Sequence, residues 1–569
     1  MIYFVAAVAA IAGMLFGFDE GVIAGALHTL RSQFAITAWD EGLMTAAVPL
    51  GALFGALIAG YAADRYGRRK TLIAASILFI VGALVASAIT AIWMLSAARL
   101  MLGVAIGIAA MVAPLYISEN APASRRGMLI SIYQLAVTLG ILGAYIVNFA
   151  LGEAWRIMFL LGALPAFALF IGMVVLDETP RWLVAKGRNQ QALAALARIR
   201  AEPPESVNVR NELADIESAY AAERSRPAAR WPDLLSPVAK PALIVGIGLF
   251  LLQQLSGINA VIYFAPTVFQ EAGFDTHDTQ ILATIGIGII NVAMTVVGMA
   301  LIDRIGRRRL LALGFIGATL SLGLIAVGAL TEAQWLDIVA SIGLALYIAS
   351  FAVSIGPLPW VMMAEIFPHH VRGLGMSAAT LANWGFNFLV VFSFPAMVSG
   401  LGLGGVFTIY ALACLAGVAF TFRCVPETSG VTLEQIEAHL KSGRPFNQLR
   451  PAIAPAVPDP AAVQSSLALP REDADAILAA ALAFSPYRQS LTPLLDRIGP
   501  IAYDNHQVRV ALHTIWVRAD FANTGVLRRA HLGSQASVLN LFLEHIHYSS
   551  PAFLSSVGEG QPDGDPEHA

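Results

Sequence analysis

The sequence predicts an all-α membrane protein in which twelve transmembrane helices form two pseudo-symmetric bundles of six. Three observations support this fold class: the composition, the spacing of long apolar segments, and motifs that occur once in each half of the chain. Of the 569 residues, 57% are hydrophobic and 13% charged, whereas a soluble protein is about 45–50% apolar and about 25% charged. The net charge of −3 excludes no class of partner. The only two cysteines, Cys414 and Cys424, lie in or beside one apolar segment and indicate no disulfide framework.

The first six apolar segments each approach or exceed the roughly 20 residues that a helix needs to cross a bilayer. They fall at 2–27, 42–62, 71–92, 94–118, 127–150 and 156–176. The first segment follows no basic stretch and is too long for the hydrophobic region of a signal peptide. We therefore expect it to be the first spanning helix, and residues 1–176 to form the N-terminal six-helix bundle.

A polar stretch, 177–239, separates the two sets of helices. Within it, Asn189–Arg200 and Glu205–Arg224 have the pattern of short amphipathic helices, which we expect along the cytoplasmic membrane surface. A plain linker is the alternative. We expect residues 240–424 to form the C-terminal six-helix bundle. Its apolar segments fall at 240–266, 280–302, 310–330, 336–362, 373–398 and 403–424.

The chain changes character after this second bundle. Residues 425–450 carry a cytoplasmic end motif, and 451–569 form an extra cytoplasmic tail of unknown role that opens with a proline-rich, extended linker. The tail contains two helix-like segments, a strand-like alternation and a final stretch with the composition of disorder. These are Glu472–Phe484, Ser534–Tyr548, Val508–Leu512 and Gly558–Ala569. His545 and His547 are two residues apart and do not share a helix face, so we predict no metal site there.

Three charged motifs recur in the two halves of the chain at nearly constant spacing. They are the Asp-Arg-x-Gly-Arg-Arg loops at Asp64 and Asp303, 239 residues apart, Glu119 and Glu365, 246 apart, and Glu178 and Glu427, 249 apart. Because each motif follows the same helix of its set, the pattern indicates a duplicated six-helix unit around a central cavity. Rocking the two bundles would expose this cavity to one side of the membrane at a time. The positive-inside rule places the basic loops and both termini in the cytoplasm.

Two carboxylates, Asp19 and Glu20, lie inside the first apolar helix. A charge at the bilayer centre costs about 2.5–3.5 kcal/mol on insertion scales, so Asp19 needs a partner, a proton or water. Arg99 in the fourth helix is the expected partner, and a change in water access would let Asp19 exchange a proton. A static ion pair is the alternative. Glu20 lies about 100° around the helix from Asp19, and the sequence leaves its role open. The glycines at 13, 17, 21 and 25 share one helix face and would let another helix approach closely.

Uncharged polar side chains cluster in the apolar helices. Amides offer paired donors and acceptors, which suit neighbouring hydroxyls of a sugar, and aromatic rings can pack against the C–H face of a sugar ring. Isolated amides that only join helices are the alternative. The candidate substrate-binding residues are Phe16, Gln134, Gln253, Gln254, Asn259, Tyr263, Asn291, Gly356, Trp360, Asn383 and Trp384.

The repeated charged motifs predict a gate at the cytoplasmic face. Loop arginines can pair with acidic residues after the fourth and sixth helices of each half, and such pairs would hold the halves together while the cavity faces outward. A pure topology signal is the alternative. The candidate gate residues are Asp64, Arg65, Arg68, Arg69, Glu119, Arg126, Glu178, Arg181, Asp303, Arg304, Arg307, Arg308, Glu365, Arg372 and Glu427.

These residues resemble the sugar porter family of the major facilitator superfamily over about residues 1–450. Within that family the chain is similar to the bacterial galactose–proton symporter, through Tyr133-Gln134-Leu135, Gly140–Tyr145 and Asn383-Trp384. The family motifs are Gly17-Phe18-Asp19, both Asp-Arg-x-Gly-Arg-Arg loops, Pro114–Glu119, Arg126-Gly127, Trp155-Arg156, Glu178–Trp182, Gln253–Asn259, Gly356–Trp360 and Pro426-Glu427-Thr428. The tail beyond 450 matches nothing in the family.

The resemblance implies a major facilitator fold, with Asp19 as the proton-coupling carboxylate and Arg99 as its partner. It also implies that the amides and Trp360 contact sugar. Facilitative glucose transporters carry Asn at the position of Asp19, which favours symport. Ile141 stands where the related xylose symporter has glutamine, which argues against a pentose. Asp177 and Thr179 replace the Pro and Ser of the family motif, and we expect no functional consequence.

The sequence therefore predicts proton-coupled import of a monosaccharide, a hexose such as galactose or glucose, by alternating access. A facilitative uniporter, or a sugar sensor that uses the tail, are the alternatives. We expect no enzyme activity, cofactor, metal or nucleic-acid partner. The expected partners are the sugar, protons and the lipid bilayer of the cell (inner) membrane, around a monomer.

Overall fold

The computed structural model describes residues 2–122, 126–224 and 230–449. The segments predicted within 451–569 lie outside the described residues. In the described part, eleven helices are long and apolar enough to cross a membrane. The last of them, α18 (Arg372–Cys424), consists of two helices joined at Gly402, where φ is 67° and ψ 172°. The described chain therefore contains the twelve spans that the sequence predicts.

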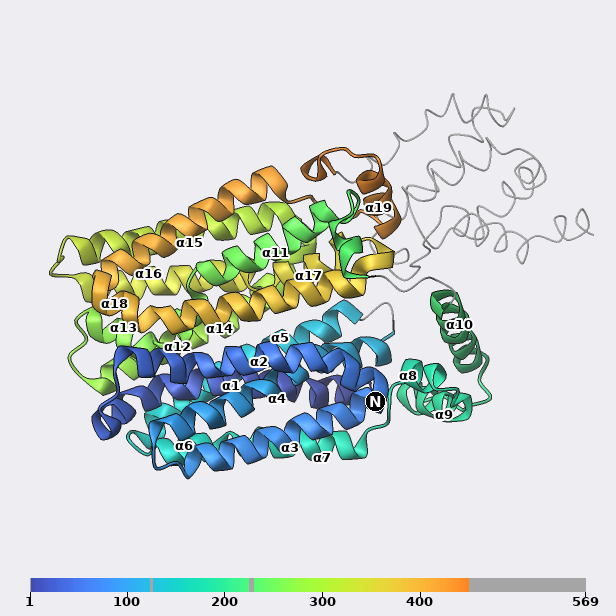
Figure 1. The fold of residues 1–569 in the computed structure, drawn as a ribbon, viewed down its shortest axis with the longest axis horizontal. Coiled ribbons are helices and arrows are strands. Elements are labelled where there is room, and N and C mark those ends of the chain that lie inside the picture. Colours follow the sequence, from blue (N-terminus) through green and yellow to red (C-terminus); the bar gives the residue numbers. More distant parts are fainter. Residues whose placement is uncertain (1, 123–125, 225–229, 450–569) are drawn as a thin grey trace, which may run out of the picture. The chain divides into compact units, whose positions relative to one another are not determined.

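The N-terminal half, α1–α7, supplies the first six spans, shown in blue and cyan in Figure 1. Its sixth span is interrupted at Gly162 between α6 and α7. The helices are α1 (Ile2–Phe34), α2 (Ala38–Tyr66), α3 (Arg68–Ser87), α4 (Ile92–Asn120), α5 (Arg126–Leu151), α6 (Trp155–Leu161) and α7 (Ala163–Val175).

The C-terminal half, α11–α18, supplies the other six spans, shown in green to orange in Figure 1. Its first and fourth spans are broken, the fourth by the π-helical turn η3 (Phe351–Ile355). The remaining helices are α11 (Lys240–Leu255), α12 (Ile258–Tyr263), α13 (Ala265–Glu271), α14 (His277–Ile305), α15 (Arg307–Leu330), α16 (Leu336–Ser350) and α17 (Leu358–Ile366).

Short helices lie between the halves and after them. α9 spans Asn189–Arg200, the range that the sequence predicts, and α10 spans Val207–Arg224, two residues shorter at its start than predicted. Both lie at the end of the bundle that also carries α19 (Figure 1). The other short elements are α8 (Pro180–Ala185), η2 (Trp231–Leu235), η4 (His369–Val371), α19 (Leu433–Lys441) and η5 (Phe446–Gln448).

The glycines of α1 form its contact with α5. A Cβ added at Gly17 would lie 1.9 Å from the Val137 carbonyl oxygen, and one at Gly13 would lie 2.6 Å from the Tyr133 carbonyl oxygen. The same close approach recurs at Gly25, against the side chain of Asn148, whose Nδ2 donates to the Gly21 carbonyl at 2.8 Å. Only glycine permits backbones to come this near. The spacing by four residues therefore holds α1 tightly along α5.

The two repeated loops have the same backbone conformation. Gly67 and Gly306 have φ of 102° and 91°, a region that side chains other than glycine rarely adopt. An added Cβ would also meet the carboxylate of Glu178 at the first loop and of Glu427 at the second. Each glycine is thus required both for the turn and for the acid that packs against it.

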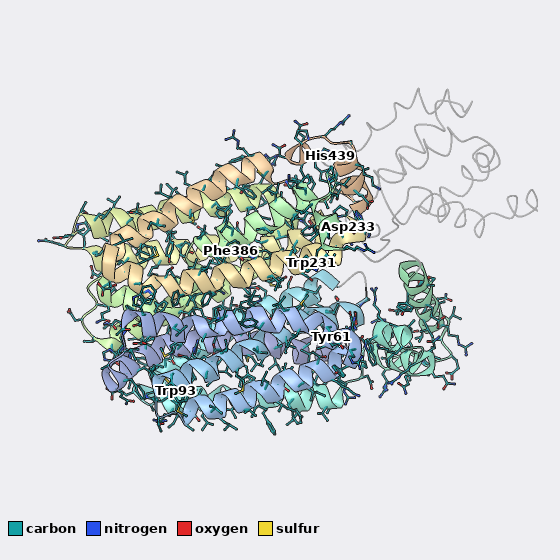
Figure 2. All side chains as sticks on the ribbon, in the orientation of Figure 1. Tyr61, Trp93, Trp231, Asp233, Phe386 and His439 are labelled. Atoms are coloured by element: carbon teal, nitrogen blue, oxygen red, sulfur yellow. The ribbon has the colours of Figure 1, made fainter. Side chains whose placement is uncertain are left out.

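Exposed aromatic side chains lie near both ends of the helical bundle. Trp93 is 70% exposed at the start of α4, whereas Tyr61 is 66% exposed in the last part of α2. Figure 2 shows Trp93 toward one end of the helices and Tyr61 and Trp231 toward the other. Tryptophan and tyrosine favour the two interfaces of a membrane. Together with the apolar helices between them, they fit a bundle that spans a bilayer.

Candidate functional site

The carboxylate of Asp19 and the guanidinium of Arg99 face each other inside the N-terminal half. Arg99 Nη2 lies 3.3 Å from Asp19 Oδ2 and Nη1 lies 3.5 Å from Oδ1. Both side chains are buried, at 2% and 0% exposure. The Nε atom of Arg99 donates to the Met44 carbonyl at 3.1 Å, and its guanidinium lies 6.0 Å from the Phe159 ring centre. The arginine is thus held by α2 and α6 as well as by its acid.

The distances leave this ion pair loose. Charge-assisted N–H···O bonds are usually about 2.7–2.9 Å long, shorter than either contact here. A small cavity of ≈ 10 Å³ borders Asp19 and is lined by Phe18, Val22, Phe159 and Gly162, with Phe79, Ala83 and Leu102. This is about the room that one water needs. The arrangement provides a buried acid, a single cationic partner, and space beside them for water.

Three of the predicted amides form one hydrogen-bonded chain in the C-terminal half. Asn259 Nδ2 donates to Gln254 Oε1 at 2.8 Å, and Gln254 Nε2 donates to Asn383 Oδ1 at 2.7 Å. The chain joins α12, α11 and α18, and all three side chains are buried. Gln254 uses its amide oxygen and its amide nitrogen within the chain. The Asn259 oxygen and the Asn383 nitrogen lie at its two ends.

Gln253 has a structural contact of its own. Its Nε2 donates to the carbonyl oxygens of Ile355 and Gly356 at 2.8 and 2.9 Å. These carbonyls lie where η3 interrupts the fourth span of the C-terminal half, so the regular helical partners are missing there. Gln253 therefore stabilises the break at Gly356, and its nitrogen is occupied.

The remaining candidate substrate residues are not part of this hydrogen-bonded chain of amides. Phe16 and Trp384 pack edge to face across the two halves with ring centres 5.4 Å apart, and Trp360 packs against Phe250 at 4.8 Å. The Tyr263 hydroxyl is buried without a hydrogen-bond partner among the described residues. Asn291 is also buried, and Gln134 is partly exposed.

In the N-terminal half, the repeated motif forms a closed network of charges. Arg68 Nη2 lies 3.0 Å from Glu119 Oε1, and Arg68 Nη1 lies 3.0 Å from the exposed Asp64. Glu178 accepts the backbone N–H groups of Arg68, Arg69 and Thr179 at 3.0–3.2 Å. Burial raises the pKa of Glu178 above its ordinary value, although these N–H groups oppose the shift.

The C-terminal half repeats this network. Arg307 Nη2 lies 3.3 Å from Glu365 Oε1, and Glu427 accepts the backbone N–H groups of Arg307, Arg308 and Ser429 at 3.0–3.2 Å. The side chain of Arg308 donates to the Phe422 and Asn447 carbonyls, and that of Arg372 to the Phe367 carbonyl. In the other half, Arg69 likewise donates to the Met173 and Val174 carbonyls.

These contacts show how the predicted gate residues pair in this structure. The ion pairs of Arg68 with Glu119 and Asp64, and of Arg307 with Glu365, each lie within one half, in which the sequence also pairs these arginines and glutamates. The reason is geometric, because the acid lies at the end of the helix beside its own loop. Arg65, Arg181 and Arg304 are exposed. The side chains of Arg126 and Asp303 lie outside the described part of the chain.

Sequence reasoning missed one residue of each network. Thr179 donates its hydroxyl to Glu119 Oε2 at 2.5 Å, and Thr428 donates to Glu365 Oε2 at the same distance. Both threonines follow a motif glutamate by one residue, which is the signal that would have identified them. Thr179 stands where the family has serine and keeps the hydroxyl that this contact requires.

Besides the contact between Phe16 and Trp384, several contacts cross between the halves at the end opposite the basic loops. Arg31 pairs with Glu41 and also donates to Thr267 Oγ1 of α13 at 3.3 Å. The Tyr145 hydroxyl donates to the Ile262 carbonyl at 3.0 Å. These residues belong to no repeated motif, so the sequence did not indicate them.

Aromatic rings cross between the halves in the same region. His28 of α1 stacks on His277 of α14 with ring centres 4.7 Å apart, and Trp39 of α2 packs on Phe392 of α18 at 5.4 Å. Together with the Arg31 and Tyr145 contacts, they close the interface of the halves at this end, which we call the outer end.

Twelve spans in two halves, a buried acid–arginine pair in one and an amide chain in the other define a membrane transporter of the major facilitator type. A family model described as "Sugar (and other) transporter" matches residues 5–440. The D-xylose transporter of Levilactobacillus brevis is 39% identical over 439 residues, which cover 76% of this chain and 94% of that protein. The galactose-proton symporter of Escherichia coli K12 is 36% identical over 456 residues, 79% of this chain and 96% of its own.

Solved structures agree with these relatives. The proton:xylose symporter XylE bound to 6-bromo-6-deoxy-D-glucose has a TM-score of 0.65 and 30% identity, covering 77% of this chain and 98% of its own. The inward-open conformation of XylE from E. coli has a TM-score of 0.66 and 29% identity, with coverage of 77% and 99%. The chain belongs to the sugar transporter family of the major facilitator superfamily, and it is a multi-pass membrane transporter rather than an enzyme.

Proposed function

We propose that the chain imports a monosaccharide together with a proton by alternating access, with Asp19 as the group that carries the proton. The observation that supports this most strongly is the loose, buried pair of Asp19 and Arg99 beside a cavity of water size. An acid in such a place can release its proton, which leaves a carboxylate that Arg99 stabilises. It can regain a proton when water reaches the cavity.

The relatives support the class of reaction. The galactose-proton symporter and the proton:xylose symporter carry proton coupling in their names. A membrane potential of 100 mV contributes about 2.3 kcal/mol per proton. At about 1.4 kcal/mol per factor of ten, one proton per sugar sustains roughly a fiftyfold gradient.

We propose that sugar hydroxyls bind the free ends of the amide chain, at the Asn259 oxygen and the Asn383 nitrogen. Gln254 then positions these two groups, since its own amide is occupied within the chain. Phe16 and Trp384 meet from opposite halves, so a sugar bound beside them would contact both halves at once. As a finer proposal, the sugar is a hexose, galactose or glucose, because Ile141 lacks the amide of the related xylose symporter.

We also propose that the basic loops and both termini face the cytoplasm of the cell (inner) membrane. The basic loops satisfy the positive-inside rule, and Arg308 in one of them donates to the carbonyl of Asn447, near the end of the described chain. With this orientation, closure at the outer end makes the present structure an inward-facing or occluded state.

Transport by purified protein in proteoliposomes tests these proposals. Wild-type protein should concentrate labelled sugar under a proton gradient, whereas Asp19→Asn should lose uphill uptake and keep counterflow of sugar. Asn387→Ala is the matched control and should keep uphill uptake, because it alters a buried amide that is not part of the hydrogen-bonded amide chain. Uphill uptake by Asp19→Asn would refute the coupling role.

Counterflow with labelled galactose, glucose and xylose, each in turn, identifies the substrate. Efficient exchange of xylose without galactose or glucose would refute the hexose proposal. Unbuffered medium should become alkaline when sugar is added to cells. A facilitative uniporter would leave its pH unchanged.

A further inference from the structure

Glu20 is a second carboxyl inside α1 that the proposed mechanism does not use. Its side chain is 2% exposed, and its Oε1 atom is buried without a hydrogen-bond partner among the described residues. It follows Asp19 directly but faces a different direction, since successive helical residues are about 100° apart. Arg99 forms its ion pair with Asp19, and Glu20 has no ion pair within the part of the chain that the structure describes.

Among the described residues, Glu20 interacts electrostatically with one acid and three tyrosines. Asp19 acts on it electrostatically from the same helix. Tyr133 and Tyr145 lie within its electrostatic reach from α5, and Tyr263 from α12. Tyr145 donates its hydroxyl to the Ile262 carbonyl, whereas the hydroxyls of Tyr133 and Tyr263 are buried and unpartnered within the described chain.

Part of this environment comes from the other half of the molecule. α1 and α5 belong to the N-terminal half, whereas α12 belongs to the other half. The bond from Tyr145 to Ile262 joins the halves beside Glu20, and the Arg31 and His28 contacts close the interface further along α1. Separating the halves at this end would remove Tyr263 and admit water to Glu20.

An ionised carboxylate in this position would be unfavourable. Burying a charge without an ion pair or hydrogen bonds costs far more than burying a neutral polar group. The protonated acid instead has an O–H donor and a carbonyl acceptor, which match tyrosine hydroxyls that can both donate and accept.

We propose that Glu20 is a second proton-binding group, which takes up a proton from the outer water as the halves close at the outer end. When the halves open there, the carboxylic acid returns that proton to the same water and becomes a carboxylate. The outer closing step therefore depends on pH independently of Asp19. This inference rests on the proposed transport function, because it assigns a proton to one step of that cycle.

The first test compares Asp19→Asn with the double variant Asp19→Asn/Glu20→Gln in proteoliposomes. Labelled sugar exchange is measured with equal pH on both sides, across the alkaline range. In Asp19→Asn, Glu20 should still make the rate of sugar exchange fall as the pH rises. The fall should reach about tenfold per pH unit where closing of the outer end limits the rate. The neutral amide of the double variant mimics the protonated acid, so its exchange should be nearly independent of pH.

The second test needs no transport. Infrared difference spectra of the wild-type protein should contain the C=O stretch of a buried carboxylic acid. This band should persist in Asp19→Asn, shift in Glu20→Asp and vanish in Glu20→Gln. Glu20→Asp keeps the carboxyl, so it controls for misfolding of the amide variant.

Either test can overturn the proposal on its own. Equal pH profiles of the single and double variants, or an acid band that survives Glu20→Gln, would overturn the proposal. If Asp19→Asn does not exchange sugar at all, the proposed coupling role of Asp19 fails, and the infrared band alone decides whether Glu20 binds a proton.

Discussion

Replacing Gly17 by alanine should loosen the contact between α1 and α5. The added Cβ would lie 1.9 Å from the Val137 carbonyl oxygen and 2.9 Å from the Ile141 nitrogen. Both are backbone atoms, so no side chain can rotate away. Reaching an ordinary contact of 3.4 Å requires the helices to separate locally by about 1.5 Å. Such overpacking costs about 1–3 kcal/mol, more than the roughly 0.5–1 kcal/mol that alanine gains over glycine in a helix.

Gly143 on α5 offers a matched control. No atom lies within 4 Å of a Cβ added there, so Gly143→Ala should receive the helical gain without the clash. The assay is thermal unfolding of the purified protein in detergent, followed by tryptophan fluorescence, together with sugar counterflow. Gly17→Ala should unfold at a lower temperature than Gly143→Ala and the wild type. If the two variants are equally stable, the close packing of α1 on α5 is not what the glycines provide.

Three further predictions follow from the networks and the amide chain. Arg68→Gln should lower stability by about 3 kcal/mol, the lower end for breaking a buried pair, because it removes the cation that pairs with Glu119 at 8% exposure and leaves the Thr179 hydrogen bond in place. Arg65→Gln, at an exposed site, should change stability little, and equal unfolding temperatures of the two variants would contradict this. Because burial raises the folded-state pKa of Glu178 above 4.5, the folded protein holds that proton more tightly than the unfolded chain. Stability should therefore fall as pH rises from 4.5 through the raised value, and thermal unfolding at several pH values should show a weaker fall in Glu178→Gln. Asn383→Ala should raise KM for sugar about tenfold, since an unmatched polar group costs about 1–3 kcal/mol, whereas Asn387→Ala should not; similar KM values for both would argue against the amide chain as the sugar site.

The sequence was sufficient for the fold class because length and hydropathy alone define spanning helices. It was also sufficient for the pairing of Asp19 with Arg99, since an acid within an apolar helix requires a partner and few cations lie at membrane depth. The packing of α1 was indicated by its four glycines, although their partner α5 was not.

The other contacts of the site depend on how each helix is rotated and how far apart the helices lie, which the spacing of residues in the sequence does not determine. Repeated arginines and acids indicate which residues pair within each half, but not whether such pairs hold the two halves together. The contacts of Arg31 and His28 join residues far apart in the chain that carry no motif. For Glu20, only the packed structure shows that Tyr263 of the other half lies within its electrostatic reach.

The doubled charge networks have a mechanical consequence. Because Arg68 and Arg307 each tie together the helix ends of a single half, each half is braced against internal deformation at its loop face. Movement between transport states is then mainly a rigid-body rotation of one half relative to the other. An antibody fragment that binds one half alone should not slow the transport cycle, whereas one that binds both halves across their interface should stop it.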